Sequence, residues 1–232
     1  MRNRLHQLIL IASVLPASWL GMMVVHELGH VIGAWLTGGT VGKVVLHPLA
    51  ISRTDLAWNP HPLFVSAAGP IVGVLLPLAV LAVAQLARLR AVAPNAQSPA
   101  LHCQPLEPSR GAKISVLMLF LSAFICVHLR FQTARYLLRF FAGFCLVANG
   151  VYIGVASFAR VGDAADLLFY GAAPWHLWLF AAITIPLGFF LWHGQGRHFG
   201  LGESRGNVNP RAACISLAVL TAIVVLELLL CP

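Results

Sequence analysis

Long apolar stretches alternate with short polar ones along most of this chain. A membrane-spanning helix needs about 20 mainly apolar residues. Six stretches approach or exceed that length: 7–36, 62–87, 114–129, 136–159, 174–193 and 212–231. The pattern therefore predicts an all-α polytopic membrane protein with about five to six transmembrane helices, of which the 114–129 stretch is the shortest candidate.

The polar segments between these stretches are of two kinds. Residues 88–113 are rich in Pro and residues 193–210 in Gly, which is typical of surface loops. Residues 37–56 differ, because Gly38 and Gly39 end the first apolar stretch and "VGKVVLHPLAI" is rich in β-branched residues. We expect a short strand or hairpin at the membrane edge here, with its backbone groups satisfied by protein or water rather than lipid.

Nothing in the pattern divides the chain into two folded units. We expect a single membrane-embedded domain over residues 1–232, with a core at 7–90 and 136–170 and peripheral helices at 174–193 and 212–231. The basic start and apolar core of the first 19 residues also fit a secretory signal peptide. The apolar run continues past that point without a loop, which favours a retained first span.

Composition supports a membrane protein. The chain is 59% hydrophobic and 9% charged, whereas soluble domains have roughly a quarter of their residues charged. The net charge of +8 comes from basic residues scattered between apolar segments. Such residues are typical of contacts with anionic headgroups, so we expect the lipid bilayer, and no nucleic acid, as a partner. The five cysteines form no CxxC pair and indicate small buried apolar side chains.

The chemistry of the chain centres on "HELGH", residues 26–30, inside the first apolar stretch. Ionisable groups are costly in a membrane span, so three together favour a function over a hydrogen-bonded polar cluster in a helix bundle. His26 and His30 lie on one helix face and can bind one ion. Glu27 stands beside that ion, where it can take a proton from water. This is the HExxH arrangement of two zinc ligands and a general base, and it predicts a site for one Zn²⁺.

A catalytic zinc normally has three protein ligands and one open position. Besides Glu27, the acids available as a third ligand are six: Asp55, Glu107, Asp163, Asp166, Glu203 and Glu227. Asp163 and Asp166 stand together in a polar interruption between apolar runs, where a bundle would return a ligand to the first helix. The residues themselves leave the choice between these two open.

Three motifs, taken in order, resemble the site-2 protease (M50) family of intramembrane zinc metallopeptidases. They are HELGH in an apolar helix, "SAAGP" (66–70) opening the next span, and "VGDAADLL" (161–168). The resemblance covers about residues 20–90 and 145–170. It implies that His26 and His30 are zinc ligands and that Glu27 is the general base.

The resemblance also bears on the third ligand. In the family this ligand is an Asp, most often followed by Gly. Here Ala164 follows Asp163, which resembles a shorter bacterial branch with a D-A-x-x-L pattern. Asp163 is thus the implied ligand, with Asp166 in reserve. The family further places an Asn before this Asp to bind substrate backbone. Asn149 is the candidate for that substrate-binding role, with helix packing beside Gly150 as the alternative.

The function implied is that of an intramembrane zinc metalloprotease, which hydrolyses a peptide bond in or near a membrane-spanning segment of a protein or peptide substrate. The expected location is the bacterial inner membrane. An extended substrate could pair with the 40–52 edge. The alternative is a non-proteolytic relative that acts as a metal-binding or scaffold protein, but such a site does not need Glu27. A metal transporter would need polar residues spread along a path through the bilayer.

The third ligand sets a condition on topology. If all six apolar stretches span, Asp163 emerges at the surface far from His26 and His30, about 30 Å away across the bilayer. We therefore expect 114–129 to be re-entrant or interfacial, so that 136–159 runs parallel to the first helix. With six spans, the 15 Lys and Arg residues would divide seven to eight between the two sides, so charge predicts no orientation.

Overall fold

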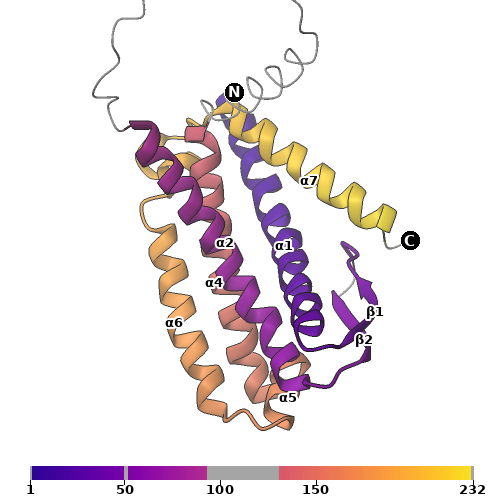
Figure 1. Ribbon diagram of the computed structural model, residues 1–232. Helices are drawn as coiled ribbons and strands as arrows, with labels where there is room; N and C mark the ends of the chain where they lie inside the picture. The colour runs from indigo at the N-terminus through magenta and orange to yellow at the C-terminus, as the bar shows by residue number, and fades with distance from the viewer. Residues whose placement is uncertain (1, 50–51, 93–130, 231–232) are drawn as a thin grey trace, which may run out of the picture.

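The computed structural model describes residues 2–49, 52–92 and 131–230. Figure 1 shows its helices and a small hairpin. The α-helices are α1 (Arg2–Leu36), α2 (Pro62–Val92), α4 (Phe131–Ala159), α5 (Gly162–Phe169), α6 (Pro174–Trp192) and α7 (Pro210–Leu230). Among the described residues, all of these helices except α5 are long and apolar enough to cross a membrane. The predicted all-α polytopic membrane fold is thus confirmed. The 114–129 stretch lies outside the described residues.

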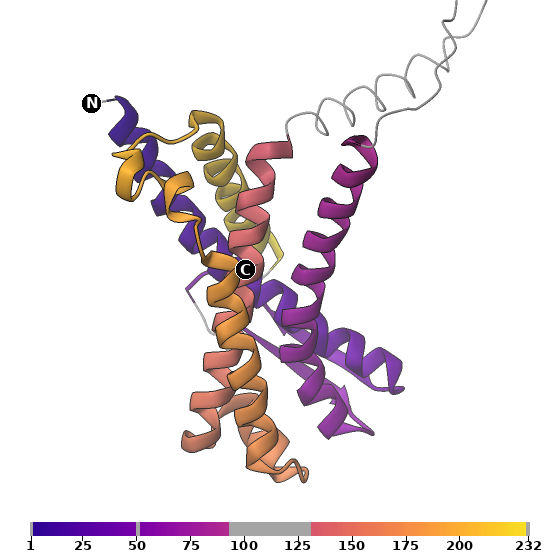
Figure 2. The same ribbon diagram turned by 90° about the vertical axis from the view of Figure 1, so that its left-hand side faces the viewer.

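The long helices form a bundle in which α1, α2 and α4 are central. Helix α6 packs along α4, and α7 packs along α1. Figures 1 and 2 show that α1 and α4 run in the same direction, opposite to α2 and α6. The predicted parallel course of 136–159 and the first helix is confirmed. Helix α2 ends and α4 begins at the end of the bundle where the N-terminus lies, here called the N-terminal end. The opposite end is called the hairpin end.

The helices extend beyond the apolar stretches that predicted them. Helix α1 begins five residues before residue 7, and α2 continues five residues past residue 87. Backbone hydrogen bonding does not stop where hydrophobicity stops, because polar side chains are tolerated on a helix at headgroup level. Leu10 and Val14 are buried in a core cluster with residues of α4 and α7. Residues 2–19 therefore belong to α1, and this part of the helix packs within the bundle.

Small residues bring α1 and α2 together. A Cβ on Gly33 would lie 2.7 Å from the Cβ of Ala68, and a Cβ on Gly29 would collide with the backbone of Ala68. Such close approach is typical of helix contacts in membranes. Gly69, in the SAAGP motif, lies directly against the His30 ring, and a side chain there would overlap the imidazole. This motif thus holds α2 against the HELGH turn.

The predicted hairpin is present just after α1. Strands β1 (Thr40–Val45) and β2 (Arg53–Trp58) pair antiparallel, with a register irregularity near Val41. Gly38 adopts φ +75° where α1 ends, a conformation that glycine allows at little cost. The segment predicted as a Gly-rich loop contains two short 3₁₀ turns, Gly196–Phe199 and Gly202–Ser204.

Candidate metal centre

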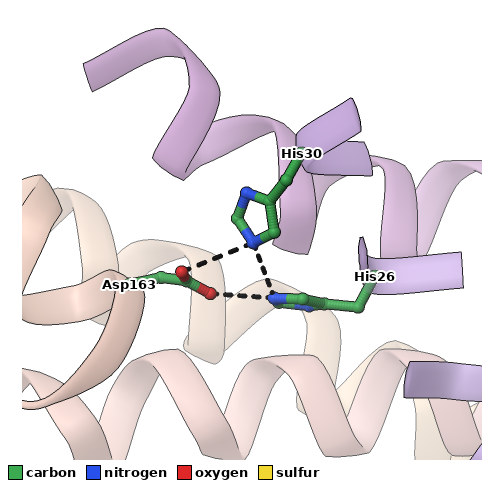
Figure 3. Close-up of side chains that lie close together, drawn as sticks. All are labelled: His26, His30 and Asp163. Atoms are coloured by element: carbon green, nitrogen blue, oxygen red, sulfur yellow. Dashed lines mark hydrogen bonds and ion pairs between the residues drawn. The ribbon is translucent and has the colours of Figure 1, made fainter. Parts of the chain in front are cut away.

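Three side chains converge near the hairpin end of the bundle. His26 and His30 come from α1, and Asp163 comes from the first turn of α5 (Figure 3). The Nε2 atom of His26 lies 2.8 Å from Oδ2 of Asp163, and the Nε2 atom of His30 lies 3.4 Å from Oδ1. The two Nε2 atoms are 3.2 Å apart. Residues 137 positions apart in the sequence therefore present donor atoms to one point.

A sharp turn between α4 and α5 places Asp163. Arg160 and Gly162 both have positive φ, +54° and +56°, so the chain reverses immediately after α4. A Cβ at Gly162 would overlap the hydroxyl of Tyr152, which makes glycine necessary there. The Tyr152 hydroxyl in turn accepts a hydrogen bond from the backbone N–H of Asp163 at 3.2 Å. Asp163 is thus held both through its backbone N–H, which bonds to Tyr152, and through its carboxylate, which contacts the histidines.

In each imidazole, the nitrogen that points away from the triad, Nδ1, faces a hydrogen-bond acceptor. Nδ1 of His30 lies 2.8 Å from the carbonyl oxygen of Val65, which can only accept, so Nδ1 carries the proton. Nδ1 of His26 lies 2.8 Å from Oδ1 of Asn149. The Asn149 amide nitrogen donates to the carbonyl of Cys145 at 2.8 Å, which fixes its oxygen toward His26. Both neutral rings therefore have a lone pair on Nε2.

These tautomers make the triad suitable for a cation. Two Nε2 lone pairs and a carboxylate face one another in a buried site, with no donor hydrogen among them when both rings are neutral. Zinc bonds to nitrogen and oxygen are near 2.0–2.1 Å, so two ligands of a tetrahedral ion are about 3.3 Å apart. The three observed separations are 2.8, 3.2 and 3.4 Å. The residues present therefore fit one zinc ion.

The two candidate aspartates differ in position. Burial opposes ionisation of Asp163, but when His26 and His30 are protonated, their hydrogen bonds and positive charges outweigh that effect and hold the pKa of the carboxyl well below its ordinary value. Asp166 is exposed one turn later on α5 and is not part of the triad. Partial burial and the nearby charge of Asp163 raise the pKa of Asp166. The structure thus brings Asp163, and not the reserve residue, to the histidines.

Glu27 lies at the wall of the same cavity. Its side chain is 3% exposed, and Oε2 accepts a hydrogen bond from the Thr54 hydroxyl of β2 at 2.7 Å. The cavity has a volume of about 480 Å³ and is bounded by α1, α2, α4, α5 and the hairpin. Its lining includes all three triad residues and Glu27. A cavity of this size is typical of small-ligand and substrate sites.

Several residues of the site were missed by sequence reasoning. Thr54, Val65 and Tyr152 each bond to a predicted site residue, yet none belongs to a recognisable motif. From the sequence, Asn149 was the candidate for binding substrate. The structure places it, 1% exposed, between His26 and Cys145. Its contact with substrate stays a prediction, while its contact with a histidine adds a role that spacing alone did not indicate.

Comparisons with known proteins add no relative to this description. No family model, no curated protein and no solved structure matches the chain.

Proposed function

We propose that this chain is a zinc metalloprotease that hydrolyses a peptide bond in or near the membrane. The observation that carries the proposal is the buried convergence of His26, His30 and Asp163 beside a glutamate that is not part of the triad. These three residues would hold the ion. A bound Zn²⁺ would supply Lewis acidity, which polarises a peptide carbonyl and makes water more acidic.

Glu27 has the properties of a general base. It follows His26 directly on α1 and lines the cavity, and among the described residues its hydrogen-bond partner is Thr54, through one carboxylate oxygen. The other oxygen is available to accept a proton from water in the cavity. The same group can return that proton to the leaving amine, as general acid–base catalysis requires. Thr54 acts as a positioning residue for this carboxylate.

The hairpin suggests how a substrate would lie. The hairpin residues that line the cavity come from 52–59, and they include Thr54, Leu56 and Asn59. An extended peptide lying along this strand would pass over Glu27 and the triad. Strand addition exposes a scissile bond and is a common mode of peptide recognition. The sequence predicted pairing with the 40–52 edge, whereas the strand that lines the cavity is β2, so we expect the substrate to lie along β2.

The membrane setting follows from the long apolar helices, while a bacterial inner membrane and a membrane protein as substrate are part of the proposal. Helical substrates must unwind before cleavage, because a helical peptide bond is shielded by its neighbours. Strand β2, which borders the cavity, offers backbone partners for an unwound segment.

The test is Glu27→Gln in the purified full chain, reconstituted in proteoliposomes with a single-pass model substrate. We expect cleavage to fall by about 10²–10⁴-fold, with zinc content near one ion per chain. The matched control is Glu203→Gln, on an exposed turn at the other end of the bundle, which should change neither quantity. Full activity of Glu27→Gln would refute the protease mechanism. Stoichiometric zinc with no cleavage by the unaltered chain would favour the metal-binding scaffold.

A further inference from the structure

The cavity that the triad lines is elongated along α1. Its lining on this helix begins at Trp19 and ends at His30, and the lining residues recur every three or four positions, on one helix face. This stretch of helix is roughly 16 Å long. The metal-binding residues occupy the part nearer the hairpin end, from His26 onward. The part that precedes His26 is here called the inner end of the cavity.

The inner end of the cavity has an apolar wall. It is formed by Met22 and Met23 of α1 and by Ala148 of α4. Ala148 packs against the core cluster that contains both methionines, so α1 and α4 meet behind this wall. The residue after Ala148 is Asn149, whose Oδ1 lies 2.8 Å from Nδ1 of His26. The three wall residues, here called the inner subsite, are therefore close to the metal centre.

The opposite end of the cavity is polar. At the hairpin end its lining includes Ser52, Arg53, Asn59 and Asp166. Arg53 and Asp166 are exposed and carry opposite charges. Each residue of an extended peptide advances by about 3.3 Å, so a peptide along the cavity passes from polar to apolar surroundings within a few residues. The cavity thus distinguishes the two sides of a scissile bond at the metal centre.

The inner subsite is not closed by other parts of the described chain. Core clusters are ordinarily filled by the packing of their own side chains. Here Met22 and Met23 are 8% and 7% exposed and still border the cavity, and Ala148 is half-buried rather than buried. Because Ala148 has the smallest side chain of the three, a larger residue at this position would fill part of the cavity.

We propose that the inner subsite holds one apolar side chain of the substrate and that Ala148 sets the size of the side chain it takes. This inference rests on the proposed function, which puts the scissile bond at the metal centre. Met22 lies four residues before His26 on α1, roughly 6 Å along the axis. That length is less than two residues of an extended chain. The side chain in the subsite therefore belongs to one of the two residues next to the scissile bond.

The chemistry of the subsite favours aliphatic side chains. Methionine is flexible and polarisable, so Met22 and Met23 can adapt to linear and branched shapes. Neither methionine nor alanine has a side-chain hydrogen-bond donor, and a thioether is a weak acceptor, so a charged substrate side chain would be buried without a partner. Apolar pockets commonly discriminate about 10-fold or more for one methylene group. We expect leucine to be preferred to alanine by at least about 10-fold and lysine to be rejected.

The test compares substrates that differ in one side chain. The purified full chain in proteoliposomes is given a single-pass model substrate, and the cleaved bond is mapped by mass spectrometry. Alanine, leucine or phenylalanine is then placed at each of the two positions on either side of that bond. In Ala148→Leu the subsite is narrower, so we expect the leucine-to-alanine ratio of kcat/KM to fall by about 10-fold at one position. Ala159→Leu, exposed at the end of the same helix, is the matched control and should leave the ratio unchanged.

A second variant changes the size of the subsite in the opposite direction. Met23→Ala widens it, so we expect the phenylalanine-to-leucine ratio of kcat/KM to rise by about 10-fold at the position that Ala148→Leu affects. Combining the two substitutions should bring the leucine-to-alanine ratio back toward that of the unaltered chain. Ratios that stay within about twofold of the unaltered chain in both single variants would overturn the proposal.

A binding measurement separates this inference from the proposed function. The Glu27→Gln chain in nanodiscs is titrated with fluorescent alanine–serine peptides that carry a single leucine, alanine, phenylalanine or lysine. We expect the leucine peptide to bind about 10-fold more tightly than the alanine peptide, and Ala148→Leu to abolish that difference. This result without cleavage by the unaltered chain would leave the subsite standing and remove the protease. Cleavage without any side-chain preference, in rate or in affinity, would do the opposite.

Discussion

The residues of the candidate site at the hairpin end and the arginines at the N-terminal end differ in burial. At the hairpin end, His26, Glu27 and Asn149 are almost fully buried and each bonds to another part of the protein. At the N-terminal end, Arg197 and Arg211 are exposed and belong to different elements, a 3₁₀ turn and α7. One end concentrates a few groups at one point, and the other spreads charge over a surface.

The difference shows which kind of interaction each end depends on. In a low-dielectric interior, a polar group without a partner costs several kcal/mol, so the buried groups must be placed precisely. An exposed arginine interacts with mobile headgroups and tolerates many positions. The effect of a substitution at the hairpin end should therefore depend on which atoms it removes. At the N-terminal end, the effect should depend only on the change in charge.

The largest effect is expected at Asp163, the proposed third ligand. Asp163→Asn replaces the carboxylate of the proposed ligand by a neutral amide, so we expect zinc affinity and cleavage to fall together by more than about 100-fold, beyond the effect typical of outer-shell residues. Metal content by mass spectrometry and cleavage in proteoliposomes measure the two quantities. Asp166→Asn, three residues later and exposed, should retain both. Zinc loss in Asp166→Asn alone would assign the ligand to that residue instead.

Matched glycines compare the two ends directly. In Gly69→Ala the new methyl group would overlap the His30 ring, so that ring must shift and we expect zinc affinity to fall by about 10–100-fold. In Gly196→Ala, near the N-terminal end, the methyl group would meet only Leu201 at 3.6–4.0 Å. We expect its zinc affinity to be unchanged. Equal losses of zinc affinity in the two variants would show that the close contact between Gly69 and the His30 ring is not needed for zinc binding.

A smaller effect is expected at the outer partner of His26. Asn149→Ala removes the acceptor that faces Nδ1, so the ring loses its orientation and we expect about 10-fold weaker zinc binding. Asn149→Asp keeps an acceptor oxygen at that place and should bind zinc more tightly than the alanine variant. If both variants bind like the unaltered chain and only the substrate KM rises, Asn149 acts on substrate, as the family resemblance implied.

The smallest effect is expected at the hairpin. Thr54→Val removes one hydrogen bond to Glu27, and such bonds contribute about 1 kcal/mol, so we expect cleavage to fall by about 5-fold with zinc content unchanged. Thr54→Ser retains the hydroxyl and should keep most of the activity. Loss of zinc in Thr54→Val would mean that the hairpin supports the metal rather than the base.

Much of the site was predictable because it depends on local spacing. His26 and His30 are one helical turn apart, so any helix through this segment places them on one face. The condition that 136–159 runs parallel to the first helix followed from bilayer thickness, and the structure confirms it. Thr54 and Tyr152 could not be found in this way, because a hydroxyl in a strand or a tyrosine in a span has no characteristic spacing.

The sequence by itself determined the membrane class, the long helices, the hairpin after the first of them and the pairing of two histidines with a glutamate. Each of these depends on hydrophobicity or on neighbours within one turn or strand. Only the tertiary structure decided that Asp163 rather than Asp166 meets the histidines, and which tautomer each histidine adopts. These properties depend on the direction and packing of helices whose contacting residues are 35 to 137 positions apart in the sequence, and no pattern within one helix or strand specifies such contacts.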